Sequence, residues 1–202
     1  MAILTAWILA RHRFPGHAAL NAFVHLPLVL PPVVTGWLLL VLFGIRGPIG
    51  ALLHGWFDIR LVFTTAGASL ACGVMVFPIM VRAIRLSLEA ADPGLDMAAR
   101  TLGAGRWDRL VNVTLPLAAP GILAGTIVAY VTSLGEFGAV VTFAASIPGE
   151  TQTLPLAIYA ALQIPGGEEK AATLSAISVA LAVLGLAASE YASRRLNALL
   201  GR

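Results

Sequence analysis

Charge is what this chain of 202 residues most lacks, since only 11% of its residues are charged against about 25% in an average soluble domain. Cysteine is almost absent, with Cys72 alone, which excludes a disulfide-stapled secreted scaffold. In their place, 58% of the residues are hydrophobic and the mean hydropathy is +0.88. A soluble domain needs a polar surface, and a disordered chain needs low hydrophobicity. The composition therefore predicts an all-α, polytopic membrane protein.

Residues that commonly carry catalysis or bind metal are few and scattered. The only lysine, Lys170, lies outside any Gly-Lys-Ser/Thr sequence, which excludes a P-loop ATP site in this chain. The four histidines stand singly, so we expect no metal site and no cofactor. Ser133 and Glu136 are three residues apart but have no histidine or lysine nearby in the sequence, so no hydrolase triad is indicated.

The net charge of +3 does not indicate a nucleic-acid partner. The arginines fall in short stretches between apolar runs rather than in a basic stripe, and no nucleic-acid-binding motif accompanies them. Arginine near the ends of membrane helices explains the same pattern. We therefore expect the chain to contact a lipid bilayer and no nucleic acid.

Membrane-spanning segments need about 20 mostly apolar residues to cross a hydrocarbon core of about 30 Å. Two apolar segments are too short: Leu154–Leu162, expected as an interfacial or re-entrant helix, and Ala2–Ala10, expected as the last turns of a helix whose beginning is absent. Four full spans are predicted, at about Ala22–Phe43, Leu61–Ile84, Leu117–Phe143 and Ala171–Ala192.

Lysine and arginine are unequally divided between the two sets of loops. Three of the 13, namely Arg46, Arg60 and Lys170, lie on one side of the expected spans, and the other ten lie on the opposite side. By the positive-inside rule, the side with ten faces the cytoplasm. This orientation places the C-terminus and a long loop, about residues 86–116, in the cytoplasm, where a partner would most readily dock.

Prolines and one acid interrupt two of the expected spans. Pro27, Pro31 and Pro32 indicate either a kinked helix that faces a cavity or a span that begins after Pro32. Glu136 must face protein or water at bilayer depth; its carboxylate would repel a doubly charged anion, so it is expected in a gate or as a structural hydrogen-bonding group. The pathway and gate candidates are Pro31, Pro32, Ser133, Glu136 and Phe137.

Small residues recur every four positions in the third expected span. They are Gly121, Gly125, Ala129 and Ser133, and this period forms a helix-packing face in membranes. We expect the face to be buried, but the sequence does not distinguish packing within one subunit from packing across a dimer.

The long cytoplasmic loop contains a short predicted helix. Residues 95–102 are rich in helix formers, Pro93 and Gly94 can open the helix, and Gly103 can end it. Ala98 and Ala99 would allow another surface to approach the backbone closely. The helix either packs under its own protein or docks onto a partner.

This loop resembles a cytoplasmic signature of type I bacterial ABC importer permeases: Glu-Ala-Ala, three residues, Gly, nine residues, Ile, one residue, Leu-Pro. Ala98-Ala99, Gly103, Val113 and Leu115-Pro116 match it in register, and Met97 replaces the glutamate. The resemblance implies that residues 1–202 form one permease domain of this fold, whose coupling helix sits in a groove of a separate ATPase subunit. The residues implied in coupling are Asp96, Met97, Ala98, Ala99, Arg100, Gly103, Leu115 and Pro116.

Nearly the whole chain resembles molybdate permeases. The segments that carry this likeness are His25–Val34, Phe77–Arg85, Ala98–Trp107, Ser133–Ala139 and Ile147–Thr151. The resemblance implies the pathway subunit of an ATP-driven molybdate importer in a bacterial inner membrane, working as a homodimer with two ATPase subunits. It also implies a periplasmic or extracellular molybdate-binding protein at the outer loops, with Glu150, Thr151, Gln152 and Thr153 as contact candidates.

Other functions stay open at this stage. Sulfate permeases look similar around Gly135–Gly138, so a sulfate or tungstate permease is the alternative within the class. From other classes, the alternatives are a membrane-embedded enzyme that uses Glu136 and a scaffold that transports nothing.

Overall fold

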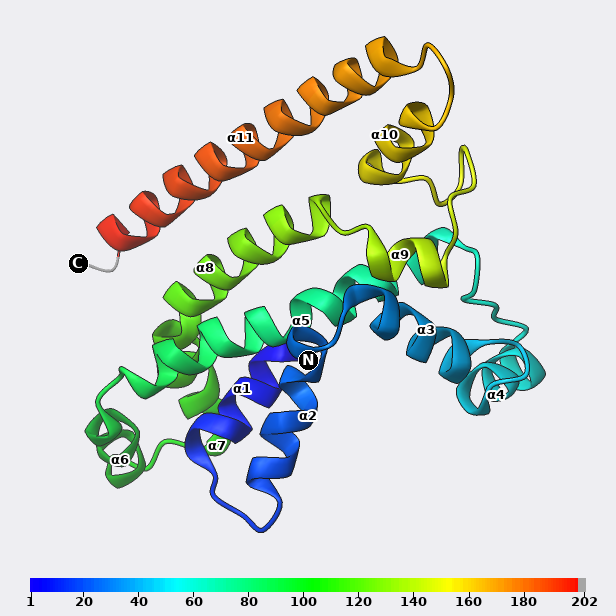
Figure 1. The fold of residues 1–202 in the computed structure, drawn as a ribbon. Helices are drawn as coiled ribbons and strands as arrows, with labels where there is room; N and C mark the ends of the chain where they lie inside the picture. The colour runs from blue at the N-terminus through cyan, green and yellow to red at the C-terminus, as the bar shows by residue number, and fades with distance from the viewer. Residues whose placement is uncertain (200–202) are drawn as a thin grey trace. The chain divides into compact units, whose positions relative to one another are not determined.

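The computed structural model of the chain describes residues 1–199, with side chains at all of them except positions 93, 192, 193 and 195–199. This described part is built of helices and contains no strand, as the composition predicts. In chain order (Figure 1) the helices are α1 (Ala2–Arg11), α2 (His17–Val29), α3 (Pro32–Phe43), α4 (Pro48–Phe57), α5 (Thr65–Glu89), α6 (Pro93–Thr101), α7 (Arg106–Arg109), the π-helical turn η1 (Leu110–Thr114), α8 (Leu115–Leu134), α9 (Gly138–Phe143), α10 (Leu154–Leu162) and α11 (Glu168–Leu199).

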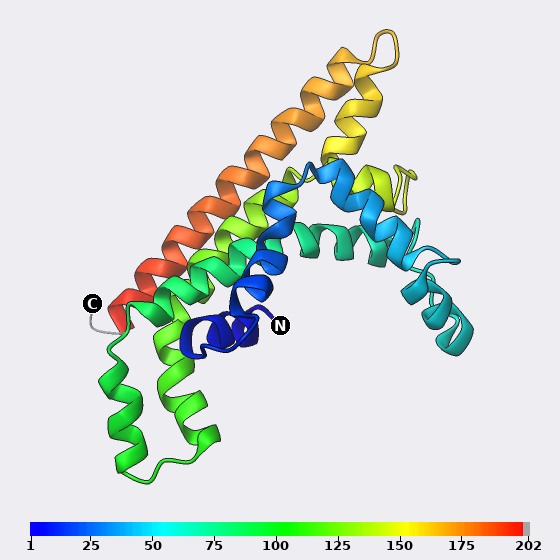
Figure 2. The same ribbon diagram turned by 60° about the horizontal axis from the view of Figure 1, so that its bottom comes forward.

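Three helices among the described residues are long and apolar enough to cross a membrane. They are α5, the continuous helix Arg106–Leu134 that joins α7, η1 and α8, and Glu168–Tyr191 of α11; Figure 2 shows α11 as one long helix. Helices α2 and α3 together reach the same length, but the chain bends by 117° between them. The number of spans is therefore three, or four if the bent pair counts as one span. Only the second count agrees with the four predicted spans.

The first expected span, Ala22–Phe43, is not one helix. Helix α2 continues through Pro27, and α3 begins at Pro32. Proline is favoured at the first position of a helix, because the N–H that it lacks would have no partner there. The Pro31 carbonyl accepts the N–H groups of Val34 and Thr35, at 2.9 and 3.2 Å. The proline pair therefore sets the bend and starts a new helix at Pro32; the cavity of the first alternative stays a prediction.

The third expected span, Leu117–Phe143, was wrong at both ends. The helix begins upstream, at Arg106, because η1 carries it past Pro116. Proline offers no N–H to the carbonyl four residues before it, and the Leu115 N–H bonds five residues back, to Leu110. At the other end the helix stops at Leu134, and α9 starts again at Gly138.

One compact unit contains Met1–Val24, Phe77–Ala129 and the chain from Leu186 onward. In its core, Ala6 and Leu9 of α1 are buried with Val81, Ile84 and Leu88 of α5. The His17 ring is joined to the Leu9 carbonyl by a hydrogen bond of 3.0 Å, and Arg85 donates to Asn21 at 3.0 Å. These contacts fix α1 and the start of α2 against α5.

Three of the four small residues of the expected stripe, Gly121, Gly125 and Ala129, are buried in this unit. A Cβ atom at Gly121 would lie 2.5 Å from the Ala83 carbonyl oxygen, and one at Gly125 would lie 3.2 Å from the Ala83 Cβ atom. The expectation of burial is therefore confirmed for these three residues, and the two glycines pack on α5 within the subunit. The fourth residue of the stripe, Ser133, is only half-buried.

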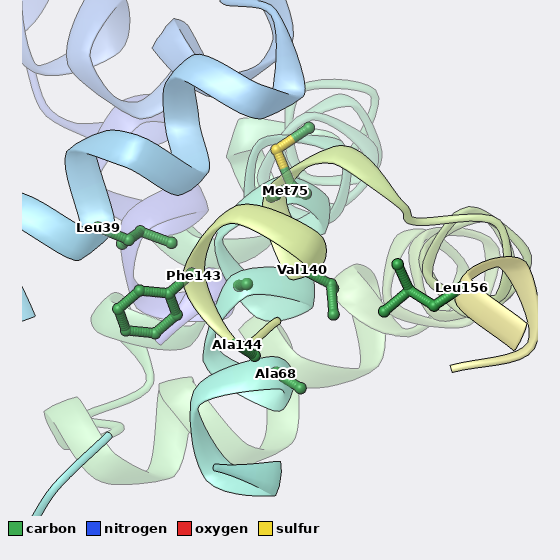
Figure 3. Packing of buried hydrophobic residues seen from close by; sticks show 9 residues of the cluster. Leu39, Ala68, Met75, Val140, Phe143, Ala144 and Leu156 are labelled. Carbon is green, nitrogen blue, oxygen red and sulfur yellow. The ribbon is translucent and has the colours of Figure 1, made fainter. Parts of the chain in front are cut away.

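The second compact unit contains His25–Val76 and Tyr130–Gly185. Its core, shown in Figure 3, is centred on Phe143 and Val140 of α9, with Leu39 of α3, Met75 of α5 and Leu156 of α10 around them. Helix α10 has the boundaries that the sequence analysis gave it. Helix α4, ten mostly apolar residues that begin at Pro48, was not among the expected elements.

Candidate functional site

Helix α6, the expected coupling helix, has well-defined ends. The Asp92 side chain accepts the Gly94 N–H at 2.7 Å, and Pro93 follows at the first helical position. At the other end, Gly103 has φ +84° and its N–H bonds to the Arg100 carbonyl at 3.0 Å. A glycine in this left-handed conformation is a common helix stop, so both predicted signals are confirmed.

The exposed side chains on α6 and just after it include two large apolar ones. Met97 is 62% exposed and Leu102 is 87% exposed, and Ala98 lies between them on the exposed side. No atom lies within 4 Å of where a Cβ would stand at Gly103. Large apolar side chains that are exposed on a helix are typical of a surface that another molecule covers. Figure 2 shows α6 and the helix from α7 onward as two arms of one projection.

Asp96 is turned toward the rest of its own loop. Its carboxylate accepts from the Arg109 guanidinium at 3.0 Å, and the two side chains are partly buried. The acid beside Met97 therefore ties α6 to α7 and does not replace the missing glutamate on the free surface.

The remaining coupling candidates are spread over the loop. Ala99 is half-buried and Arg100 is exposed, whereas Leu115 and Pro116 begin α8 rather than lying on α6. Met97, Ala98 and Gly103 are thus exposed on α6 and just after it, whereas Leu115 and Pro116 lie at the start of α8.

Glu136 lies in a break between helices rather than inside a span. Residues 135–137 are non-helical, and the Glu136 side chain is 7% exposed. Its Oε1 atom accepts the Ala139 N–H at 2.9 Å. A carboxylate at the N-terminus of a helix is stabilised by free N–H groups and by the helix dipole. Glu136 therefore caps α9, which is a structural hydrogen-bonding role, one of the two roles that the sequence analysis gave it.

Three other pathway candidates lie at the same break. A Cβ at Gly138 would lie 2.8 Å from the Cβ of Pro32, so α9 begins directly against the start of α3. Phe137 packs edge-on against Tyr159 of α10, with ring centroids 5.2 Å apart. Ser133 lies in the last turn of α8, and its carbonyl accepts the Glu136 N–H at 3.2 Å. Two chain breaks that are distant in sequence are thus brought together by the crossing of α3 and α9.

Residues of α3 that the sequence analysis did not single out complete this crossing. A Cβ at Gly36 would lie 2.7 Å from the Ala139 carbonyl oxygen. Thr35, beside it, is 4% exposed, and its hydroxyl has no hydrogen-bond partner. A lone glycine inside an apolar run is a known sign of close backbone approach, and this signal was present at Gly36.

The four candidates for contact with a binding protein differ in how far their side chains are exposed. Thr151 is 3% exposed, and its hydroxyl accepts the Ile147 N–H at 3.0 Å. Gln152 donates to Ser146 at 3.3 Å, and Thr153 precedes α10 and is half-buried. Glu150 is exposed, and its carbonyl accepts the Thr65 hydroxyl at 2.9 Å. Of the four, only the Glu150 side chain is presented outward.

No group of three or more potential metal ligands occurs among the described side chains. The carboxylate of Glu136, the buried acid, accepts the Ala139 N–H as a helix cap.

The fold is that of an ABC importer permease. One chain of a bacterial alginate ABC transporter, crystallised in complex with an alginate pentasaccharide-bound periplasmic protein, superposes with a TM-score of 0.72 at 18% identity. The match covers 96% of this chain and 71% of that one. At such low identity the likeness establishes the fold alone.

The chain belongs to the family of binding-protein-dependent transport system inner membrane components, which matches residues 2–198. The molybdenum transport system permease protein ModB of Escherichia coli K12 is 57% identical over 95% of this chain and 84% of its own length. The protein of the same name from Haemophilus influenzae is 49% identical over 100% of this chain and 88% of its own. The sulfate transport system permease protein CysT of Escherichia coli is 40% identical over 80% of this chain and 58% of its own. This family places the chain in the inner membrane as a multi-pass transport subunit and not as an enzyme.

Proposed function

We propose that this chain is the membrane-spanning permease subunit of an ATP-driven molybdate importer. The observation that carries the proposal is the 57% identity to a molybdenum permease over nearly the whole chain. The lower identity to the sulfate permease, 40% over a shorter stretch, makes sulfate the second candidate. The family implies ATPase subunits and a binding protein as partners, and ATP hydrolysis belongs to the ATPase subunits.

In the proposed assembly, two copies of the chain form the pathway and two ATPase subunits dock from the cytoplasm, the side that also holds the C-terminus. Arg194 lies near the end of α11, and Arg202, counted in support of this orientation, lies outside the described residues. Residues 1–202 act as one permease domain, although the chain folds as two compact units.

The coupling step is proposed to run through α6. Binding of ATP draws the two ATPase subunits together and pushes on Met97, Ala98 and Gly103 of each permease chain. Because ATP binds more tightly to one of the two arrangements of the transporter, its binding shifts the pathway between outward and inward openings. The bent α2–α3 pair and the α8–α9 break are the flexible elements of the pathway, and Glu150 is the outward contact candidate for the binding protein.

A cysteine crosslink tests the docking and the orientation together. In a Cys72→Ser background, Ala98→Cys is expected to crosslink to the ATPase subunit in intact cells. The matched control is Ala51→Cys, which is equally exposed but lies on α4, on the side proposed to face outward. Crosslinks from Ala51, or none from Ala98, would contradict the proposal.

A pair of glycines tests whether the shape of α6 matters for coupling. Neither Gly103 nor Gly105 has an atom within 4 Å of an added Cβ, but φ is +84° at Gly103 and −66° at Gly105. Left-handed backbone costs an L-residue about 1–2 kcal/mol, so Gly103→Ala should lower molybdate uptake and ATPase binding severalfold, whereas Gly105→Ala should leave both unchanged. Equal uptake by the two variants would remove the coupling role from this end of α6.

Substrate identity is tested by uptake of labelled molybdate in the assembled complex with increasing sulfate. We expect molybdate uptake to persist at equal concentrations of the two anions. Suppression by equimolar sulfate would favour the sulfate candidate while leaving the permease assignment intact.

A further inference from the structure

A groove of about 1010 Å³ lies between α1 and the segment from α6 to the start of α8. All of its lining residues belong to the first compact unit. Asp96, Arg100 and Leu115 of the expected coupling loop line the groove, but the α6 surface assigned to the ATPase, at Met97, Ala98 and Gly103, lies outside the lining.

The lining of the groove is rich in positive charge. Four arginines line it, and the single acid among the lining residues, Asp96, is already paired with Arg109 at 3.0 Å. The Nε–H group of Arg109 is buried and has no acceptor among the described residues. A buried donor without an acceptor is unfavourable, so an additional anionic oxygen at this place would be stabilising. The other three arginines are Arg11, Arg100 and Arg106.

The groove also has apolar and aromatic lining residues. Ile3 and Leu4 of α1 line it together with Leu115 and Leu117 of α8. Trp7 and Trp107 line it as well, and Trp107 is 77% exposed. Tryptophan is enriched where a membrane protein passes from hydrocarbon to headgroups, and α1 is an apolar helix that ends at Arg11.

We propose that this groove binds an anionic phospholipid, with its phosphate at the arginines and its acyl chains along the apolar lining residues. Basic pockets beside membrane helices are the usual sites for acidic headgroups, and the volume is ample for a headgroup with the first part of its chains. A free anion would satisfy the arginines but leave the apolar lining residues and both tryptophans uncovered. An acidic protein surface would not account for Ile3 and Leu4, which belong to an apolar helix. A lipid here would fasten α1 to the arm that carries α6.

Native mass spectrometry of the detergent-purified permease–ATPase complex tests this proposal. We expect short-chain phosphatidylglycerol to remain bound, at one molecule per permease chain, under conditions that release phosphatidylcholine. A juxtamembrane arginine is worth about fivefold in affinity for anionic lipid, so Arg11→Gln with Arg106→Gln should weaken phosphatidylglycerol retention roughly 25-fold. The double variant with lysine at both positions should retain it.

The matched control is Arg46→Gln with Arg60→Gln, which removes the same charge from exposed loop positions outside the groove and should leave retention unchanged. Equal retention of the two lipids, or equal loss in both glutamine doubles, would overturn the proposal. Displacement of phosphatidylglycerol by millimolar inorganic phosphate or molybdate would instead identify a site for free oxyanions, and would also overturn it. The lysine variant separates lost binding from lost folding, because it keeps the charge at both positions.

Discussion

Replacement of Glu136 separates a structural acid from one that touches substrate. In Glu136→Ala, the buried Ala139 N–H loses the acceptor that now lies 2.9 Å away. An orphaned buried donor costs about 1–3 kcal/mol. In Glu136→Gln, the side chain keeps one oxygen that can accept this N–H, and only the interaction of negative charge with the α9 dipole is lost, about 0.3–1 kcal/mol.

These free energies translate into different thermal shifts. For a chain of this size, 1 kcal/mol corresponds to about 2–4 °C in the unfolding midpoint. Thermal unfolding in detergent, followed by tryptophan fluorescence, should therefore show a loss of about 2–12 °C for Glu136→Ala and of about 1–4 °C for Glu136→Gln. Glu169→Gln, at an exposed position in the first turn of α11, is the control and should shift the midpoint least.

The same variants are then compared in transport. We expect Glu136→Gln to slow uptake or weaken assembly while the order of preference among molybdate, tungstate and sulfate stays as it is. The reasoning fails if the preference changes, because Glu136 would then contact the anion. It also fails if Glu136→Ala is as stable as the Glu169 control, because the cap would then contribute nothing.

Two glycine substitutions test the helix crossings. Gly121→Ala places a Cβ 2.5 Å from the Ala83 carbonyl oxygen and should destabilise the protein by about 1–3 kcal/mol through overpacking, whereas Gly73→Ala, in open space on α5, should be neutral or stabilising; detergent melting curves of the two variants compare them directly. Gly36→Ala meets the Ala139 carbonyl oxygen at 2.7 Å and should reduce uptake more than it reduces ATPase binding, as measured by transport and co-purification; unchanged uptake would mean that the α3–α9 crossing is not part of the pathway.

Helix α6 was predictable because its signals are local. Pro93 opens α6 and Gly103 ends it through backbone preferences that depend on neighbouring residues alone. Helix α10 was likewise bounded by its own prolines. For such elements the sequence gives the boundaries within a residue or two.

The breaks in the membrane helices were harder to predict. An apolar run indicates burial in lipid but does not show where a helix stops, since Gly135 and Phe137 are tolerated both in a helix and in a break. The helix ends at Leu134, and the Glu136 carboxylate accepts the Ala139 N–H at the start of the next helix. The start of α3 packs against Gly138 at this break, and α3 is about 100 residues away in the chain.

The amino-acid sequence by itself determined that this protein is a helical membrane protein, where helix α6 lies and which residues end that helix, because composition and local backbone preference are properties of short stretches. Only the tertiary structure decided that Gly121 packs on α5, that Gly36 lies against α9, and that four arginines share one groove with two tryptophans. These arrangements depend on which helix faces fit closely enough to exclude other atoms, and that fit is a property of the whole packed chain.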